Sequence, residues 1–598
     1  MMVDNDDFRR SIACAPHTDS ITVQAGPGSG KTTLLIERLK YIIENRINSF
    51  SGIACITYTN AAKEEIMMRL QNEGVQLSTE LFIGTIHSFL LEYVIKPYSH
   101  FKHKEGIPYK LASVGFARGY KDYIANMLGR PHYHINESMF KAFESLGRDE
   151  KGNPCCYRNK ISPSDALAWK NFIKNKGYID QQDVIYLSYL ILKKYVHIRI
   201  AFSSRFKYIL VDEYQDVTYY QEQLFSLLEH SSFFCVGDSN QSIYSFTGAK
   251  PEIFQARWNN ESHRNYRLTN NFRSTQHIVQ FANHKTEIEQ TGAGNNATRK
   301  QKVIFIKDIK EASEAIQLFQ SICSDIECEE QKKPFMILAR RNEYVKNINS
   351  LLKKQEVEVS TFFKKLAKEH YRRFQILQNL ILAISYKRRN EFDRAVERMS
   401  EAFSYLFFNE HPNYIVLVEI GYSMFMWKKL QIFTLQFLDN LVLTDISVED
   451  LFIVLKKFLM EESKKLYGKS IGKKLNMLNY KWKNQVKASK STMLSHLIEQ
   501  VELQGNLSES EGSVLNIHDA KGQEAECVLV MAEYESQLME WLEKNEEIEE
   551  ARVGYVAFSR ASKLLCVWAP SIQESKYTHL QQHVQFVDRT YTAEMESV

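Results

Sequence analysis

The sequence predicts an α/β protein with two parallel-sheet cores, each carrying a mainly helical insertion. Two observations support this prediction. Short apolar runs alternate with helical patterns in two separate parts of the chain, which is typical of βαβ units in parallel sheets. A long polar stretch of helical periodicity interrupts each of these parts. At 598 residues, the chain is also long enough for about four domains of ~150 residues each.

The first core is expected in residues 1–91 and 201–264, and its helical insertion in residues 92–200. Strands are predicted where short apolar runs end in polar residues. These runs lie at 21–23, 53–56, 81–83, 208–211 and 233–236.

The second core is expected in residues 265–363 and 508–598, and its insertion in residues 364–507. Apolar runs predict its strands at 303–306, 334–338, 512–515 and 527–531. The second insertion contains lysines interleaved with aromatic residues between positions 464 and 490, for which duplex or partner binding and a solvated charged face are both open.

Composition excludes several classes of protein. Hydrophobic residues make up 44% of the chain and charged residues 25%, which excludes collagen-like, mucin-like and wholly disordered proteins. Lys and Arg exceed Asp and Glu by 76 to 72, so any nucleic-acid site must come from local clustering of charge. The nine cysteines show no metal-ligand spacing. There is no signal-peptide pattern, and the most apolar stretch, 414–427, is too short to span a membrane. We expect a cytoplasmic protein with no membrane partner.

A glycine-rich turn joins the first predicted strand to a helix. Its small residues allow the backbone to wrap a phosphate chain, and the helix N-terminus favours negative charge. Lys31 would reach the β- and γ-phosphate oxygens of a nucleoside triphosphate, and the Thr32 hydroxyl would bind Mg²⁺. Ala25 stands where the usual pattern has its first glycine. The loop consists of Ala25, Gly26, Pro27, Gly28, Ser29, Gly30, Lys31, Thr32 and Thr33.

Two adjacent carboxylates follow the predicted strand at 208–211. Asp212 could hold Mg²⁺ and Glu213 could orient and deprotonate the attacking water, which is the arrangement that phosphoanhydride hydrolysis needs. Taken alone, an acidic pair after a strand is also typical of a helix N-terminus or a solvated loop. The phosphate loop favours the catalytic interpretation.

Six further segments stand in the order of a known family. These segments are TYTNAA at 57–62, GTIHS at 84–88, VGDSNQSIYSFTGA at 236–249, NFRS at 271–274, IHDAKGQE at 517–524 and YVAFSRA at 555–561. Through them the chain resembles the UvrD/Rep/PcrA-type superfamily 1 DNA helicases across nearly its whole length.

The resemblance implies two RecA-like cores that hydrolyse ATP with Mg²⁺ between them. Arg273 and Arg560 would approach the γ-phosphate from the second core, and Gln241 would sense that phosphate. Phe272 would stack on the adenine, and Glu524, with Gly522 beside it, would contact the ribose. The family's glutamine that reads adenine is missing from residues 7–13, so a strict preference for ATP is not implied.

The resemblance also implies a track for single-stranded DNA and DNA junctions. Stacking on bases would fall to the rings of Tyr58, Tyr244 and Phe246, and contacts with the backbone or bases to Thr59, Asn60, His87 and His518. Asp519 and Gln523 depart from the family's usual Ser and Leu.

Two functions remain open from the sequence. The first is an ATP-dependent DNA helicase or translocase of 3′-to-5′ polarity, with the polarity implied by the resemblance alone. The second is a DNA- or nucleotide-sensing regulatory ATPase subunit that works with a separate nuclease, as in antiphage systems of the Gabija type.

Overall fold

The computed structural model describes most of both predicted cores and of the first insertion. The described residues are 6–45, 51–75, 80–102, 106–112, 116–131, 134–157, 161–228, 230–284, 286, 289–324, 326, 335–353, 371–388, 392, 395–396, 398–399, 402, 450–451, 453–457, 513–545 and 548–591. The lysine-rich stretch at 464–490 therefore lies outside the described residues.

The chain forms two compact units, which are considered separately. The larger comprises residues 1–112, 122–354 and 512–598 and contains both large sheets. The smaller comprises residues 113–121 and 355–511. Its longest described element is α17 (Tyr371–Arg388), whose buried side chains include Ile376, Leu380 and Ile381.

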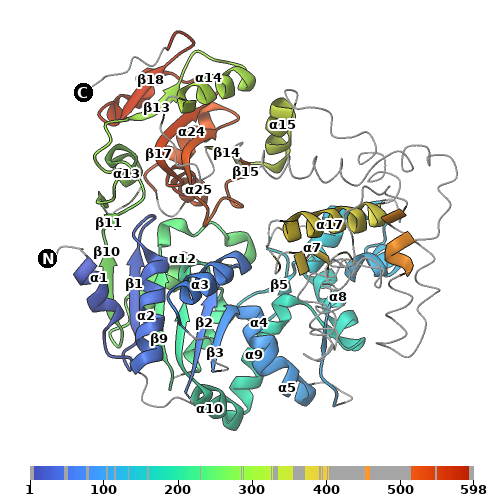
Figure 1. Cartoon of the computed structure of the whole chain (residues 1–598). Coiled ribbons are helices and arrows are strands. Elements are labelled where there is room, and N and C mark those ends of the chain that lie inside the picture. Colours follow the sequence, from blue (N-terminus) through green and yellow to red (C-terminus); the bar gives the residue numbers. More distant parts are fainter. Residues whose placement is uncertain are drawn as a thin grey trace. The chain divides into compact units, whose positions relative to one another are not determined.

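The first large sheet has six parallel strands in the order β10-β1-β9-β8-β2-β3 (Figure 1). Hydrophobic clusters cover both of its faces, one built with α2 (Lys31–Asn45) and the other with α9 (Gln181–Lys194). A sheet that is buried on both faces needs continuous apolar strands, which explains why short apolar runs predicted most of them. The strands are β1 (Ile21–Ala25), β2 (Gly52–Thr57), β3 (Leu81–Thr85), β8 (Phe206–Val211), β9 (Ser232–Gly237) and β10 (Arg264–Leu268).

Strand β10 corrects the predicted boundary between the cores. Residues 265–268 were assigned to the second core, but they pair in parallel with β1 at the edge of the first sheet. The sequence did not predict this strand because it contains no apolar run. Its residues Arg264, Asn265 and Arg267 are exposed, as is usual for polar side chains on an edge strand.

The second large sheet also has six parallel strands, in the order β15-β14-β16-β17-β13-β18. All four strands predicted for this core are present, whereas β17 and β18 were not predicted. The two parallel sheets confirm the predicted fold class. The strands are β13 (Val303–Ile306), β14 (Phe335–Ala339), β15 (Ser513–Asn516), β16 (Ala525–Met531), β17 (Ala561–Trp568) and β18 (Val584–Val587).

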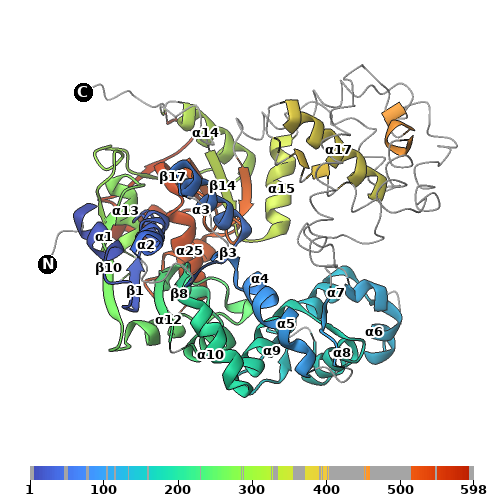
Figure 2. The same ribbon diagram turned by 60° about the horizontal axis from the view of Figure 1, so that its bottom comes forward.

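Most of the regular structure between β3 and β8 is helical (Figure 2). The longer helices there are α8 (Pro163–Asn175), α9 and α10 (Val196–Arg205). A buried ion cluster ties this region together, because Lys170 Nζ lies 2.5 Å from Asp180 Oδ2 and 3.2 Å from Asp183 Oδ1.

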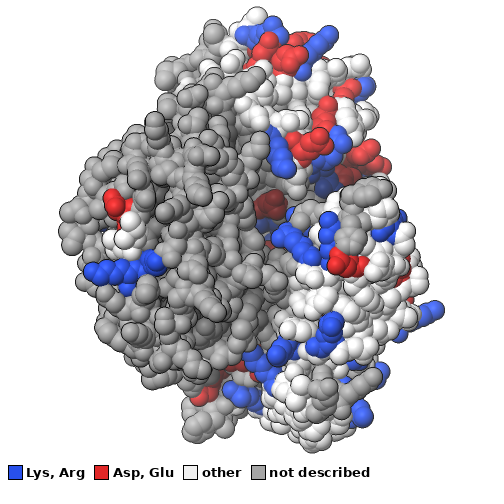
Figure 3. Space-filling view, turned by 90° about the vertical axis from the view of Figure 1, so that its right-hand side faces the viewer, with Lys and Arg blue, Asp and Glu red and all other residues white. Residues whose placement is uncertain are grey.

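The predicted first insertion concentrates positive charge. Residues 92–200 carry 18 Lys and Arg against 10 Asp and Glu, a net charge of +8, whereas the whole chain carries +4. In the lower half of the space-filling view, Lys and Arg side chains prevail over Asp and Glu on the described surface (Figure 3). A separate search of the described residues for a helix suited to crossing a membrane, by length and apolar character, finds none.

Candidate active site between the two cores

The phosphate loop lies between β1 and the first turn of α2. Gly28 and Gly30 have φ angles of +69° and +81°, a conformation that side chains with a Cβ rarely adopt. A Cβ on Gly28 would also lie 2.5 Å from Asn271 Oδ1. Ser29 Oγ donates to Gly26 O at 2.7 Å, which closes the turn. The loop therefore has the conformation that a phosphate cradle requires, with backbone N–H groups available at the start of α2.

Lys31 is the first residue of α2, and its side chain turns back over the loop. Its Nζ donates to Ala25 O at 3.1 Å, so the ammonium group lies across the cradle. Thr32 and Thr33 follow in the first turn of the helix. Thr33 Oγ1 accepts a hydrogen bond from Arg69 at 3.5 Å and is engaged with α3 (Asn60–Asn72).

The two predicted carboxylates come directly after β8, next to β2. Asp212 is buried, and its backbone N donates to Ile56 O at 2.9 Å. Glu213 has φ +50° and ψ +45°, the left-handed conformation, and its N donates to Asp212 Oδ1 at 3.0 Å. A strained backbone at a non-glycine residue fixes the direction in which the Glu213 side chain leaves the strand.

The two carboxylates have opposite pKa shifts. Burial, with the negative charge of Glu213 added, raises the pKa of Asp212. Burial would also raise the pKa of Glu213, but the nearby charges of Lys31 and Lys521 and a hydrogen bond from Gln215 outweigh it and lower that pKa. Glu213 is therefore ionised at neutral pH, as a catalytic base must be, and Asp212 is a carboxylate whose charged form needs a cation.

Gln241 belongs to a hydrogen-bonded network after β9 that also contains Gln215 and Asp238. Gln241 Nε2 donates to Asp238 Oδ2 at 2.7 Å, and Asp238 N donates to Gln215 Oε1 at 2.9 Å. Gln215 in turn donates to Glu213. Sequence reasoning did not assign roles to Gln215 or Asp238, although both lie within or beside segments that it singled out.

Arg560 of the second core reaches this network. Its Nη2 donates to Gln241 Oε1 at 3.1 Å, and its Nε donates to Val556 O at 2.9 Å. The side chain is 2% exposed, and burial followed by repulsion from Arg273 lowers its pKa to about 10. Arg560 also contributes to lowering the pKa of Glu213. The structure therefore brings Arg560, Arg273, Gln241 and Glu213 into one electrostatic environment.

The segment that contains Phe272 and Arg273 contacts the phosphate loop directly. Phe272 N donates to Gly28 O at 2.8 Å, and Asn271 Nδ2 donates to Pro27 O at 2.9 Å. Arg273 Nε lies 2.6 Å from Glu524 Oε2, an ion pair in which the Glu524 side chain is 52% exposed. This pairing places Glu524 beside the loop.

Several of the predicted DNA-binding rings form one row. Tyr58 and Tyr244 stack with ring centroids 5.1 Å apart, and Phe246 meets Tyr244 edge-on at 5.8 Å. His518 of the second core continues the row, 5.5 Å from Phe246. The Nε2 of His518 lies 3.1 Å from Ile243 O, and Tyr244 donates to His518 O at 3.1 Å. The row therefore spans both cores.

The other predicted contacts are Thr59, Asn60 and His87. Thr59 caps α3, because its Oγ1 accepts from Ala62 N at 3.2 Å. The side chain of Asn60 lies outside the described residues. Burial lowers the pKa of His87 to about 4, and its Nε2 is buried without a hydrogen-bond partner in the described part of the chain.

Comparison with known proteins now identifies the family. A model of the UvrD/REP helicase N-terminal domain matches residues 5–262, and a model of the UvrD-like helicase C-terminal domain matches residues 445–571. The chain belongs to the UvrD/Rep family of superfamily 1 helicases. The family membership predicted from the sequence is confirmed.

Named relatives of this UvrD/Rep-family chain are DNA helicases. A probable DNA helicase II homolog of Mycoplasma genitalium is 23% identical over 94% of this chain and 84% of the relative. The ATP-dependent DNA helicase Rep of Buchnera aphidicola subsp. Baizongia pistaciae is 26% identical over 93% of this chain and 90% of the relative. Rep of Escherichia coli is 26% identical over 44% of this chain and 41% of the relative. These names favour a helicase over a regulatory subunit.

Lys521 is a UvrD/Rep-motif residue to which sequence reasoning gave no role. Its buried ammonium group forms an ion pair with Asp216 and donates to Gln241 O at 2.7 Å. The turn that follows passes through Gly522, whose φ is +81°. Lys521 therefore links the second core to the network around Glu213. Its partner Asp216 lies 305 positions away, a pairing that no spacing rule reveals.

Arg9 is a second residue that sequence reasoning missed. Its guanidinium carbon lies 5.8 Å from the centroid of the Phe272 ring, and its Nε lies 3.5 Å from Glu37 Oε2. Phe272 is 37% exposed. The family pattern has a glutamine in this segment, whereas the structure has an arginine beside an aromatic ring at the edge of the phosphate loop.

The donor set suits Mg²⁺ bound together with a triphosphate. Mg²⁺ prefers oxygen ligands and is usually held by one or two carboxylates together with substrate phosphates and water. Asp212 and Thr32 supply such oxygens. A cation that is shared with a substrate does not require a metal site built from protein side chains alone. Among the described residues, no group of three or more His, Cys, Asp and Glu side chains is arranged to hold a metal.

Proposed function

We propose that the chain is an ATP-driven DNA translocase and helicase that moves 3′-to-5′ along single-stranded DNA. The observation that carries this proposal is the hydrogen bond from Arg560 to Gln241, since it brings a cation of the second core to the network that holds Glu213. Phosphoryl transfer is accelerated chiefly by positioning and charge stabilisation, so a site completed by the second core is active only when the cores are together.

Each residue has a distinct role in this proposal. Lys31 and the N–H groups of the loop bind the triphosphate, and Asp212 with Thr32 holds Mg²⁺, which supplies charge neutralisation at the β- and γ-phosphates. Glu213 accepts a proton from the attacking water. Arg273 and Arg560 stabilise the charge that develops on the γ-phosphate.

The contacts between the cores support coupling of hydrolysis to DNA movement. Ile243, from the first core, is fully buried within the hydrophobic cluster of the second core. Arg552 Nε donates to Ser242 O at 2.6 Å, one residue away. The segment between Gln241 and Phe246 thus joins the catalytic network to the row of rings. Any movement of the cores on hydrolysis would shift the rings that stack on bases.

Hydrolysis and strand displacement by purified variants test this proposal. Glu213→Gln and Lys31→Ala should abolish DNA-stimulated ATP hydrolysis, and Glu252→Gln, at an exposed position in the first turn of α12 (Pro251–Trp258), should leave it unchanged. The unmodified protein should displace a strand from a duplex with a 3′ single-stranded tail. Displacement only from a 5′-tailed duplex would overturn the polarity, and hydrolysis without displacement of either would overturn the helicase activity.

A further inference from the structure

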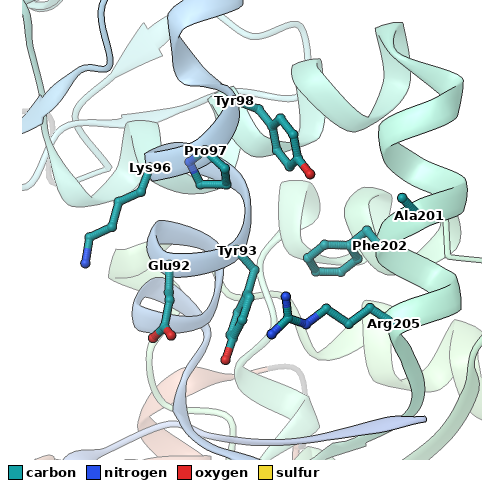
Figure 4. A pocket seen from close by; sticks show the side chains of 8 residues that line it. All are labelled: Glu92, Tyr93, Lys96, Pro97, Tyr98, Ala201, Phe202 and Arg205. Atoms are coloured by element: carbon teal, nitrogen blue, oxygen red, sulfur yellow. The ribbon is translucent and has the colours of Figure 1, made fainter. Parts of the chain in front are cut away.

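A pocket lies between two helical segments far from the catalytic network. One wall is formed by η1 (Leu91–Ile95) and α5 (Lys96–Tyr98), and the other by α10. Its volume is about 720 Å³. Figure 4 shows Tyr98 directed from the first wall toward Ala201 and Phe202, and Arg205 extending from α10 toward Tyr93. Lys96, Pro97 and Glu92 complete the lining.

The pocket lies near the N-terminal ends of the strands of the first sheet, whereas the predicted ATP site lies at their C-terminal ends. Arg205 immediately precedes Phe206, the first residue of β8, whereas Asp212 follows the last residue of that strand. All strands of this sheet are parallel, so the phosphate loop and Asp212 both lie at the C-terminal ends of the strands. A molecule in the pocket would leave the nucleotide site and the row of rings accessible.

Two cations of the pocket have no anionic partner among the described residues. The Arg205 guanidinium lies 4.7 Å from the centroid of the Tyr93 ring and 5.5 Å from that of Phe206. Neither Arg205 nor Lys96 forms an ion pair with any side chain that the structure describes. Burial, together with the neighbouring Glu92 carboxylate of the lining, raises the pKa of the Tyr93 hydroxyl. Stacking holds the Arg205 guanidinium in place with its N–H edge available to an acceptor.

The segments that form the pocket also carry exposed apolar side chains. Phe101, Val196 and Ile200 are 48%, 48% and 49% exposed, and each is within five residues of a lining residue in sequence. The stretch from 193 to 205, which includes α10, contains four Lys and Arg and no Asp or Glu. The surface therefore combines large apolar side chains with a net positive charge, since the lining has two cations, Lys96 and Arg205, against one acid, Glu92.

We propose that this pocket and the adjoining face of α10 bind an acidic segment of a partner protein. An aromatic or large aliphatic side chain of that segment fills the space between Tyr98 and Phe202, and flanking carboxylates pair with Arg205 and Lys96. Apolar pockets with an arginine and tyrosines are typical of protein-binding sites. Exposed aliphatic residues such as Val196 and Ile200 favour a protein over nucleic acid, and the Tyr93 face is already covered by Arg205 and is closed to a base.

A random 12-residue peptide library displayed on phage provides the first probe. It is panned on the full chain, with counter-selection on the Arg205→Glu variant. Enriched peptides should share one large apolar residue flanked by Asp or Glu. Fluorescence anisotropy with the best synthetic peptide should show binding at least tenfold weaker to Arg205→Glu and to Ala201→Glu. Ala201 is exposed, so a larger side chain there fills the groove without entering the core.

Controls separate this binding from the motor function. Lys174→Glu, at an exposed position on α8, should leave peptide affinity unchanged, and all three variants should keep DNA-stimulated ATP hydrolysis. The proposal is overturned if no peptide is enriched, or if peptides bind the Arg205→Glu and Ala201→Glu variants as tightly as the unmodified chain. Competition by oligo-dT that is lost in Arg205→Glu would instead assign the pocket to nucleic acid. Loss of hydrolysis in these variants would show that the pocket belongs to the motor.

Discussion

The two large sheets have the same number of parallel strands but present opposite ends of their strands to the predicted nucleotide site. In the first sheet, the phosphate loop and Asp212 follow the C-terminal ends of β1 and β8. In the second sheet, Arg560 immediately precedes β17 and Glu524 immediately precedes β16, so both lie at N-terminal ends of strands. The first core presents its loop where an open α/β sheet usually binds a ligand, and in the proposed function the second core completes the site.

In the second sheet, the residue expected to contact DNA and the residue expected to contact the γ-phosphate lie at opposite ends of the strands. His518, which joins the row of rings, follows the C-terminal end of β15, on the side opposite to Arg560. Lys521 lies in the turn that joins β15 to β16, and it pairs with Asp216 of the first core. One turn of the second core therefore connects the residues expected to bind DNA with those expected to stabilise the transition state.

Replacing the arginine that precedes β17, Arg560→Ala, should have the greatest effect on ATP hydrolysis. Without the cation, the second core no longer stabilises charge on the γ-phosphate, and we expect kcat for ATP hydrolysis to fall by about 10³-fold or more. KM for ATP should change little, because the phosphate loop that binds ATP is in the first core. Steady-state kinetics with saturating single-stranded DNA measures both.

Arg560→Lys and Arg589→Ala are the matched variants. Lysine lacks the forked guanidinium that bonds to Gln241 and Val556 together, so it should restore little activity. Arg589 is an exposed arginine of the same core that pairs with Glu314, and its loss should have no effect. A kcat for Arg560→Ala within tenfold of the unmodified chain would show that the second core does not complete the catalytic site.

This asymmetry also explains what the sequence could predict. The phosphate loop and the Asp212–Glu213 pair were found from local chemistry, since each follows a buried apolar strand. Arg560 was found only by resemblance, because residues before a strand carry no general signal for ligand binding. Strand β17 was not predicted, although it contains a five-residue apolar run at 564–568. This run follows closely after the YVAFSRA segment, which was interpreted only as a family motif.

Long-range pairings account for two of the site residues that were not predicted, Lys521 and Arg9. Lys521 with Asp216, and Arg9 with Phe272, join residues more than 250 positions apart. Only the packing of the two cores creates these contacts, and no periodicity or spacing within one segment encodes them. Arg9 was also given no role because a glutamine, and not an arginine, was expected in residues 7–13.

Arg9→Ala in the first core should affect ATP hydrolysis less than Arg560→Ala does. The arginine and Phe272 are at the edge of the loop, where we expect them to hold the base rather than the phosphates. We expect KM for ATP to rise about three- to tenfold with kcat nearly unchanged, which corresponds to the loss of one cation–π contact. Arg10→Ala, at an exposed position in the same helix, is the control. A fall in kcat with an unchanged KM would place Arg9 with the catalytic cations instead.

The smallest expected effect concerns pH and the second core alone. His277 Nδ1 and His583 Nδ1 lie 3.5 Å apart, with His284 and Lys302 beside them. Burial lowers the pKa of His277, assisted by Lys302, and burial with His284, His277 and Lys302 lowers the pKa of His583. A histidine whose pKa is lowered by folding favours the unfolded state when it is protonated.

The contribution of these two histidines to stability should therefore be constant above pH ~6.5, the value for unfolded histidine, and should fall as pH decreases through the lowered pKa values. Between pH 7 and pH 5, a His277→Gln/His583→Gln double variant should lose less melting temperature than the unmodified chain, by on the order of a few °C. His579→Gln, at an exposed position, should follow the unmodified chain. Equal losses in all three proteins would show that the pair titrates as it does in the unfolded chain, and that the acid sensitivity of this core arises elsewhere.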